Sequence, residues 1–296
     1  MPRQEGKHAE AAACEPAAAA AGQRPRQLVL ELPLSPGMGL EDFLVTPANA
    51  AAFEVIMRWP PADAPGDAPD ARQAQAIPHV AAGQGGQMPL VPQSLPANVQ
   101  QAHALALIGP PGSGKSHLAE IWRLRHDALK ATPEALEVEA VPHLLARGAL
   151  VLEDMPAGNG GSGAAGSLPP RWETALFHLL NMARQSGARV LMTTTTSPVL
   201  WPVALPDLKS RLAALPVVEL LAPDDELLRA VLVKLFCDRQ LVVPQEVVSY
   251  LLTRMERSLA AARQLVAALD EAALREKRRI TRPLAARVLE SLQGDD

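Results

Sequence analysis

The chain has 296 residues, of which 48% are hydrophobic and 20% charged, and its formal net charge is −4. This length allows one substantial core and a small second domain. The dispersed basic residues argue against a dedicated duplex-DNA binder, and because no apolar run reaches about 18 residues we expect no membrane span. Cys14 and Cys237 lie far apart and favour a reducing compartment, which by default is the cytoplasm.

The composition changes several times along the chain. The predicted parts are, in order, a disordered tail (1–24), a short apolar peptide (25–36), an α/β domain (37–222) and a helical lid (223–296). Within the α/β domain, the stretches at about 60–98 and 158–170 are rich in Pro, Ala and Gly, and we expect both to be disordered insertions.

Strand-like and helix-like patterns alternate from residue 104, which indicates a parallel sheet covered by helices on both faces. An Ala-rich, helix-compatible run ends before Pro60. The predicted strands are Ala104–Ile108, Leu136–Ala140, Ala149–Leu152, Arg189–Thr194 and Pro216–Leu221, with helices at Lys115–His126 and Arg171–Ser186. After Pro223 only helices are expected, at Asp224–Gln240, Pro244–Met255, Leu259–Lys277 and Arg282–Leu292. The predicted fold class is α/β, with a five-stranded parallel sheet flanked by helices and followed by a small all-α lid.

The segment between the first strand and the first helix of this pattern fits the motif G-x-x-x-x-G-K-[ST]. Its glycines let backbone N–H groups face a β-phosphate, and the helix N-terminus adds a partial positive charge. Lys115 would bridge the β- and γ-phosphates, and Ser116 would bind Mg²⁺. The alternative is a Gly/Pro turn with an incidental lysine. The predicted ligands of ADP or ATP in this loop are Gly109, Pro110, Gly112, Ser113, Gly114, Lys115 and Ser116.

Two acidic residues, Glu153 and Asp154, follow the apolar run Ala149–Leu152. In P-loop proteins such residues support hydrolysis, and here Glu153 would hold Mg²⁺ while its neighbour orients the attacking water. The order Glu-Asp departs from the more usual Asp-Asp or Asp-Glu, and the longer glutamate would weaken metal placement or water activation. The alternative is that the two acidic residues merely end a strand.

These motifs resemble the DnaA branch of AAA+ proteins. Phe43–Asn49 resembles the segment that borders the adenine pocket in that family, which implies nucleotide contacts for Val45 and Asn49. Gly114–Leu118 is similar to the family's P-loop and following helix, which implies a role for His117. The resemblance therefore implies an AAA+ P-loop fold that binds an adenine nucleotide.

The resemblance extends from about Leu40 to the C-terminus. Thr195 falls at the sensor-1 position, where the family often has aspartate. Leu208–Arg211 looks like the motif whose arginine reaches a neighbouring subunit's γ-phosphate, so Arg211 is the candidate arginine finger. Arg263 matches the sensor-2 arginine, which contacts the bound nucleotide. The alternatives are a solvated loop arginine at the first position and an ordinary helix-surface arginine at the second.

The lid helices run to the end of the sequence, and we expect no helix-turn-helix DNA reader after them. The combination resembles the Hda/HdaA group, which inactivates the DnaA initiator after replication begins. Gln27–Leu32 is similar to the Gln-Leu-x-Leu peptides that dock on the β sliding clamp of DNA polymerase III, with Gln27 as the polar anchor and Leu28, Leu30 and Leu32 as apolar contacts. The alternative is an edge strand that packs on the core.

The resemblance implies a replisome-associated regulator that binds ADP or ATP, docks on the clamp and stimulates hydrolysis of DnaA-bound ATP through Arg211. A homodimer is compatible with this reading, and direct sequence-specific DNA binding is not expected. Two rivals remain: an autonomous AAA+ ATPase that acts as a helicase loader, and an accessory protein that binds DnaA but not the clamp. The loader is disfavoured because aromatic residues, which stack on single-stranded DNA, make up only 3% of the chain.

Overall fold

A computed structural model describes residues 38–61, 95–155 and 171–294 of the chain. The predicted clamp-binding peptide, with Gln27, Leu28, Leu30 and Leu32, lies outside the described residues. The same holds for most of the two predicted insertions.

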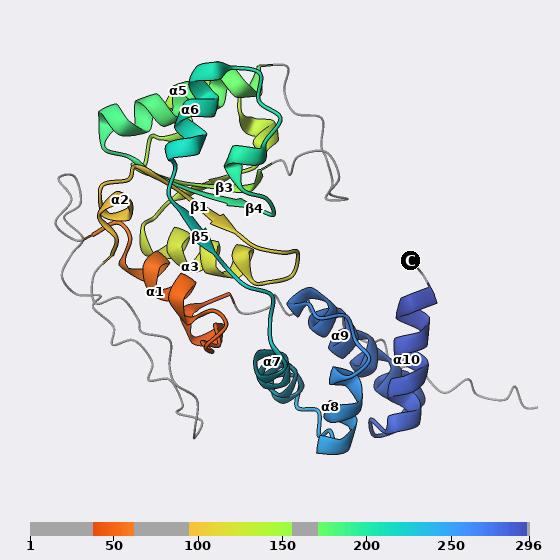
Figure 1. Cartoon of the computed structure of the whole chain (residues 1–296). Helices are drawn as coiled ribbons and strands as arrows, with labels where there is room; N and C mark the ends of the chain where they lie inside the picture. The colour runs from red at the N-terminus through yellow and green to blue at the C-terminus, as the bar shows by residue number, and fades with distance from the viewer. Residues whose placement is uncertain (1–37, 62–94, 156–170, 295–296) are drawn as a thin grey trace, which may run out of the picture. The chain divides into compact units, whose positions relative to one another are not determined.

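The described residues form an α/β domain and a helical domain (Figure 1). The strands are β1 (Ala104–Ile108), β2 (Leu129–Ala131), β3 (Ala149–Met155), β4 (Arg189–Thr194) and β5 (Val217–Glu219). The helices of the α/β domain are α1 (Ala50–Arg58), α2 (Ala97–Gln100), α3 (Lys115–Arg125), α4 (Val141–Leu144), α5 (Trp172–Ser186) and α6 (Pro206–Ala214). Short 3₁₀ turns lie at η1 (Leu40–Asp42), η2 (Pro133–Ala135), η3 (Val138–Ala140) and η4 (Pro198–Leu200). The helical domain contains α7 (Asp225–Asp238), α8 (Gln245–Leu252), α9 (Leu259–Glu276) and α10 (Arg282–Gly294).

The five strands form one parallel sheet in the order β2-β3-β4-β1-β5. This confirms the predicted sheet. Strands β1 and β3 are separated by β4, and because all strands are parallel, the segments that follow them meet at the same edge of the sheet. The candidate phosphate loop after β1 and the acidic residues at the end of β3 therefore share that edge.

The prediction of a strand at Leu136–Ala140 is wrong. The second strand is the three-residue β2, which pairs with β3, and the predicted segment begins directly after η2 and contains the whole of η3. Leu136 is fully buried, so apolar residues spaced two apart reflect burial of a turn rather than a pleated strand. Pro133, which lacks an N–H and has a fixed φ, starts the first turn.

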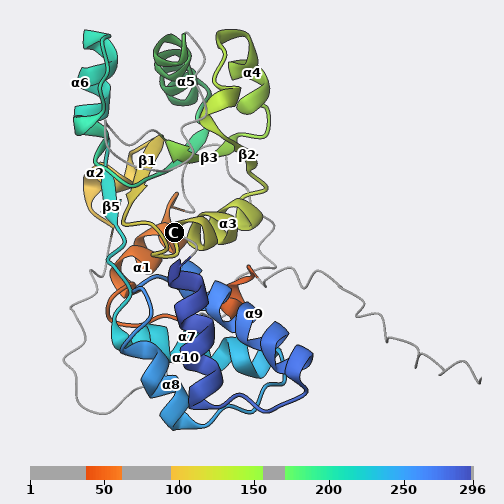
Figure 2. The same cartoon turned by 90° about the vertical axis from the view of Figure 1, so that its right-hand side faces the viewer.

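Helices cover both faces of the sheet (Figures 1 and 2). Successive side chains of a strand point to opposite faces. Accordingly, Ala149 and Val151 of β3 pack in a core with α1 and α3. Leu150 and Leu152 pack in a second core with α5 and α6. Helix α3, which follows the candidate phosphate loop, and helix α6, which carries the candidate arginine finger, thus lie on opposite faces.

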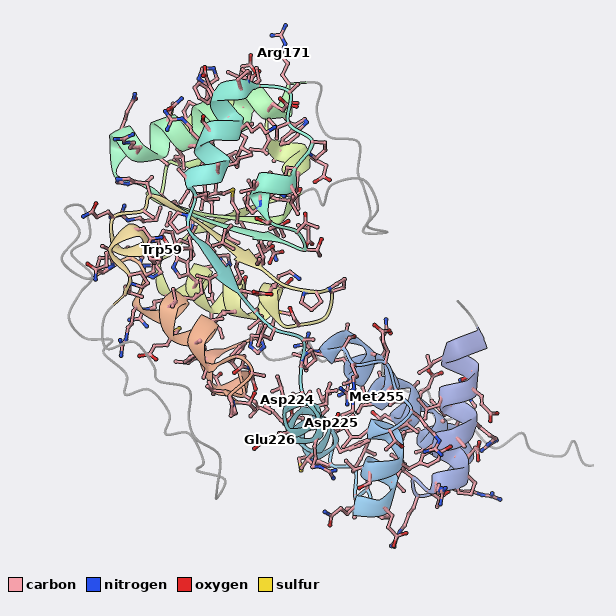
Figure 3. All side chains as sticks on the ribbon, in the orientation of Figure 1. Trp59, Arg171, Asp224, Asp225, Glu226 and Met255 are labelled. Atoms are coloured by element: carbon pink, nitrogen blue, oxygen red, sulfur yellow. The ribbon has the colours of Figure 1, made fainter. Side chains whose placement is uncertain are left out.

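Two tryptophans fix α1 against α3. The rings of Trp59, labelled in Figure 3, and Trp122 stack with centroids 5.3 Å apart, and both side chains are fully buried. The indole of Trp122 donates to the Trp59 carbonyl at 2.8 Å, and the indole of Trp59 donates to the Ala102 carbonyl at 3.3 Å. Both indole N–H groups are thus satisfied inside an apolar core, as buried donors require.

The end of the first predicted disordered insertion is structured, so the prediction is wrong for residues 95–98. Leu95 and Val99 are buried in the same core as α1 and α3. The Gln100 side chain donates to the Leu95 carbonyl at 2.7 Å and fastens the start of α2. Leu95 and Val99 are isolated within a Pro- and Gly-rich stretch, so its composition did not predict that they are buried.

The helical domain has its own apolar core, built from all four of its helices. Asp224 caps α7 by accepting the N–H of Leu227 at 2.7 Å, and Asp225 and Glu226 occupy the first turn, where negative charge is favourable (Figure 3). Ser258 caps α9 in the same way, at 2.9 Å. The four predicted lid helices are confirmed, with ends shifted by a few residues. Within the described part of the chain, no helix has the length and apolar character needed to cross a membrane.

Candidate nucleotide-binding site

The loop between β1 and α3 has a backbone that suits glycine. Gly112 and Gly114 have φ values of 68° and 104°, a region that residues with side chains rarely adopt. A Cβ at Gly109 would lie 2.3 Å from the carbonyl oxygen of Leu220, and one at Gly112 would lie 2.6 Å from Cβ of Ser258. Close neighbours therefore exclude side chains at both positions, and the loop forms the tight backbone turn expected of a P-loop.

The ammonium group of Lys115 is folded back onto this loop. It donates to the carbonyl oxygens of Gly109 and Pro110, both at 2.8 Å. Burial lowers the pKa of Lys115, and the charge of Asp154 partly opposes that shift. A polyphosphate would offer this buried ammonium charged acceptors, which bind it more strongly than neutral carbonyls.

The two serines of the loop differ in exposure. Ser113 is buried, and its hydroxyl oxygen has no hydrogen-bond partner among the described residues. Ser116 is exposed in the first turn of α3. An unpartnered buried hydroxyl beside a glycine-lined turn fits a phosphate group. The described residues contain no cluster of three or more His, Cys, Asp or Glu side chains able to hold a metal.

A bulge shapes the acidic end of β3. Between Leu152 and Met155, β3 holds one residue more than the paired part of β4. Asp154 adopts a left-handed conformation there, with φ of 53°, and its N–H donates to the hydroxyl of Thr193 at 3.0 Å. Bulges re-aim side chains and are common beside functional sites. Here the bulge leaves Asp154 exposed at the strand end, where its charge acts on Lys115.

Glu153 is paired with Lys130, a lysine that belongs to none of the sequence motifs. The ammonium of Lys130, on β2, lies 2.7 Å from Oε2 of Glu153. Lys130 is opposite Val151 in the register of β2 and β3, so Lys130 and Glu153, two residues further along, lie on the α3 face of the sheet. The Glu153 side chain is only 10% exposed, and its second oxygen, Oε1, is buried without a partner among the described residues. Lys130 is the single charged residue in the apolar segment 128–131, and this isolated charge is the sequence feature that could have identified it.

Thr193, rather than Thr195, contacts the acidic end of β3. Thr193 is fully buried on β4, whereas Thr195 is exposed just after that strand. The predicted sensor-1 role of Thr195 stays a prediction. The alternation of side chains along β4 could have identified Thr193. Thr193 lies on the same face of the sheet as Leu191, and Leu191 packs in the core with α3.

Asn49 shapes the segment before α1. Its side-chain oxygen accepts the N–H of Thr46 at 2.8 Å, and its side-chain nitrogen donates to the Leu44 carbonyl at 2.9 Å. Val45 lies between them, half-buried against the core of α1 and α3. Asn49 therefore fixes the backbone on which Val45 is carried, and direct nucleotide contacts by either residue stay a prediction.

His117 and Arg263 are brought close enough to interact electrostatically. The His117 ring meets Phe43 edge to face, with centroids 5.2 Å apart, and its Nε2 lies 3.1 Å from the Gly39 carbonyl. Burial, reinforced by the charge of Arg263, lowers the pKa of His117, so the ring is neutral at physiological pH and Nε2–H donates to that carbonyl. Burial also lowers the pKa of the half-buried Arg263.

Arg211 is carried on α6, on the sheet face opposite α3 (Figures 1 and 2). Its guanidinium carbon lies 5.3 Å from the centroid of the Phe177 ring on α5, a cation–π arrangement that orients the half-exposed side chain. The structure thus keeps Arg211 away from the face that carries the P-loop helix of its own chain.

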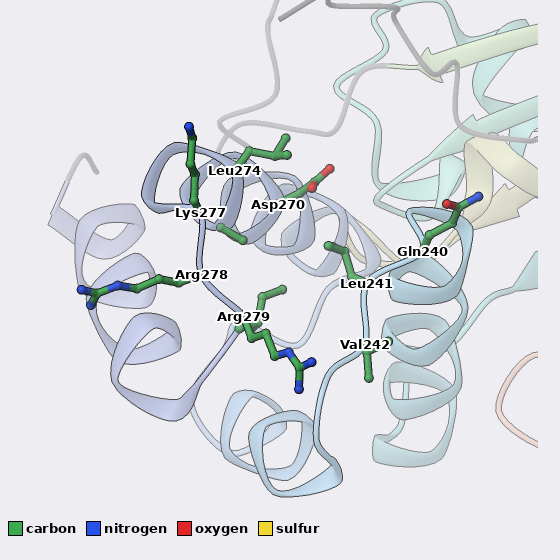
Figure 4. A pocket seen from close by; sticks show the side chains of 10 residues that line it. Gln240, Leu241, Val242, Asp270, Leu274, Lys277, Arg278 and Arg279 are labelled. Atoms are coloured by element: carbon green, nitrogen blue, oxygen red, sulfur yellow. The ribbon is translucent and has the colours of Figure 1, made fainter. Parts of the chain in front are cut away.

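A pocket of about 540 Å³ opens in the helical domain, between the segments that follow α7 and α9 (Figure 4). Its lining includes Val242, Leu274 and Arg279. None of the residues predicted to bind nucleotide lines it. The β1–α3 loop, with its orphaned hydroxyl and buried ammonium, remains the better candidate site.

Known proteins match different parts of the chain. Residues 225–289 match the model of the Hda lid domain. A protein of Haemophilus influenzae described as uncharacterized is 32% identical over 119 residues, which are 40% of this chain and 52% of that protein. The chain therefore matches about half the length of this relative.

Solved structures match over more of the chain. Domain III of the DnaA replication initiation protein of Thermotoga maritima superposes with a TM-score of 0.60 at 18% identity, covering 88% of this chain and 98% of that one. For AMPPCP-bound DnaA from Aquifex aeolicus the TM-score is 0.53 at 16% identity, covering 83% of this chain and 69% of that one. The RuvB branch migration motor of Thermotoga maritima reaches 0.50 at 18% identity, covering 64% and 62%. At these identities the similarity shows the fold alone, which this chain shares with domain III of DnaA and with RuvB.

Proposed function

We propose that this chain, a DnaA-related AAA+ protein with a lid of the Hda type, binds adenine nucleotide and stimulates hydrolysis of the ATP held by DnaA. The observation that carries the proposal is the placement of Arg211. The arginine is oriented by Phe177 and lies on the sheet face opposite the helix that follows the chain's own P-loop. An arginine in that position could complete the active site of a second molecule rather than that of its own chain.

The nucleotide is ADP or ATP, held by the β1–α3 loop. Support comes from the turn at Gly112 and Gly114, the unpartnered hydroxyl of Ser113 and the buried ammonium of Lys115. The DnaA of Aquifex aeolicus, which shares the fold, binds AMPPCP. Mg²⁺ at Ser116 would neutralise part of the phosphate charge. In this proposal the nucleotide is retained as a structural element rather than turned over.

Hydrolysis takes place in DnaA. As negative charge builds on the transferred phosphoryl group, the guanidinium of Arg211 supplies a forked positive charge from the neighbouring molecule. In other P-loop NTPases such an arginine accelerates hydrolysis by about 10³ to 10⁵. The product is DnaA in its ADP form, which prevents a second initiation.

Docking on the β sliding clamp brings the two proteins together at replicating DNA in the cytoplasm. The peptide Gln27–Leu32 supports this step by its sequence alone, and it lies outside the described residues. Deletion of residues 27–34 should abolish capture of the purified clamp in a pull-down. Unchanged capture would leave an accessory protein that binds DnaA without the clamp.

Substitution of Arg211 tests the central step. ATP is first loaded on DnaA, and its hydrolysis is followed with clamp-loaded DNA present. We expect R211A to lose most of the stimulation. R211K keeps the charge but not the fork, and should recover only part of it. K209A, which removes an exposed cation from the same helix, is the matched control and should behave as the unaltered protein. Equal stimulation by R211A and the unaltered protein would refute the arginine's role.

An autonomous ATPase is the second candidate. Asp154 favours it, because the residue is exposed at the strand end with its charge acting on Lys115, as in a site that orients water. Steady ATP turnover without DnaA or the clamp, at about 1 s⁻¹ or faster, would favour this reading. Release of less than one ADP per protein over minutes would favour retention of the nucleotide.

A further inference from the structure

The pair between Lys130 and Glu153 is built into the sheet. Lys130 sits in β2 and Glu153 at the end of β3, and the two strands are hydrogen-bonded neighbours. Lys130 also acts electrostatically on Glu120 of α3. The Glu120 carboxylate, however, already accepts two hydrogen bonds from Arg123, both at 2.8 Å. Glu153 is therefore the carboxylate that forms an ion pair with Lys130, at 2.7 Å.

We propose that Lys130 is a resident counter-cation for Glu153, which makes nucleotide binding by this chain largely independent of Mg²⁺. The inference rests on the proposed nucleotide site. In a hydrolysing P-loop protein, the acidic residue at this strand end is neutralised by the hydrated metal. Here the Lys130 ammonium, whose side chain is 46% exposed, already balances the charge of the carboxylate from 2.7 Å away from one of its two oxygens.

Two consequences follow from the charges. First, the phosphates of a bound nucleotide meet no net negative charge from the Lys130–Glu153 pair, and the nearby charge of Asp154 is offset by the ammonium of Lys115, so they can bind without metal. Second, Mg²⁺ gains little from Glu153, since only the buried Oε1 remains to accept a metal-bound water and the charge of the group is already balanced. The pair holds the Glu153 carboxylate in place without a metal, and this favours retention of the nucleotide over its hydrolysis.

A purely structural pair would also neutralise a buried carboxylate, so stability alone does not test the proposal. The informative quantity is the ratio of the Kd for ADP in EDTA to the Kd for ADP in Mg²⁺, measured on the full chain by equilibrium dialysis. For the unaltered protein we expect a ratio below about threefold. K130M keeps the apolar stem and removes the ammonium, so the free carboxylate should repel metal-free ADP and attract Mg²⁺. Its ratio should exceed about tenfold.

The double variant K130M/E153Q controls for unpaired charge. It removes both charges and leaves no buried carboxylate without a cation, so its ratio should return to that of the unaltered protein. If K130M does not fold, K130Q takes its place, because it also removes the ammonium and carries the same expectation. A ratio above about tenfold in the unaltered protein or in the double variant, or an unchanged ratio in a folded K130M, would overturn the proposal. Failure of the unaltered protein to bind ADP under either condition would instead refute the nucleotide site.

Discussion

Thr193 holds the acidic end of β3 in place through one side-chain hydrogen bond. Its buried hydroxyl accepts the N–H of Asp154 at the bulge. T193V has nearly the same volume but no acceptor, so we expect the free energy of unfolding to fall by about 1–3 kcal/mol. Urea denaturation measures the change. T193S, which keeps the hydroxyl, should retain more of the stability, and equal losses for the two variants would show that the hydrogen bond contributes little.

At the scale of residues, a site can be predicted from the sequence when its members are adjacent along the chain. The P-loop and the pair Glu153–Asp154 could be predicted because each is a short motif whose neighbours in sequence are also its neighbours in the site. Lys130 and Thr193 could not, because their roles depend on strand register: Lys130 meets Glu153 only across β2 and β3, and Thr193 meets Asp154 only across β4 and the bulge.

At the scale of elements, η1 is tied to α7 by an ion pair. The ammonium of Lys234 lies 2.8 Å from Asp42 and 3.0 Å from Asp238. The hydrogen bond from Lys234 lowers the pKa of Asp42 below its value in the unfolded chain. The stabilisation is therefore present at pH values above the unfolded pKa and is lost as the pH falls through the folded pKa.

The expected effect of D42N follows from this sign. Near neutral pH the variant should be less stable by at most about 1 kcal/mol, because the pair is partly exposed and screened. The difference from the unaltered protein should shrink towards zero as the pH falls through the acid range. D238N, which removes the other and more exposed partner of Lys234, is the control and should cost less. Denaturant midpoints at several pH values give both differences, and a difference that grows on acidification would contradict the assignment.

Elements were predictable where the chain forms them by its own pattern. Strands β1 and β4 are continuous apolar runs and were predicted with their observed bounds. Helix α6 was not predicted, because tertiary contacts define its start: Glu173 of α5 accepts the backbone N–H groups of Ala204 and Leu205, and Pro206 then begins the helix. The three-residue β2 is likewise too short to show a period, and exists by pairing with β3.

At the scale of the whole molecule, the α/β domain and the lid have separate apolar cores. A ligand that contacts residues from both should therefore stabilise the chain as a unit. The candidates for such contacts are Lys115 of the P-loop and Arg263 of α9, whose charge already reaches His117 on α3. The nucleotide would then link the two cores energetically.

Thermal unfolding with ADP tests this linkage. ADP at 100 times its Kd should add about 2.7 kcal/mol, which raises the Tm of a chain of this size by about 4 °C. K115A should abolish the shift at the same ADP concentration, because it removes the buried cation that meets the phosphates. R263A should reduce the shift if the lid arginine binds nucleotide. R257A removes an exposed lid arginine paired with Asp225 and is the matched control, which should show the full shift. A full shift in R263A would show that the nucleotide is held by the α/β domain alone, without a contribution from the half-buried lid arginine.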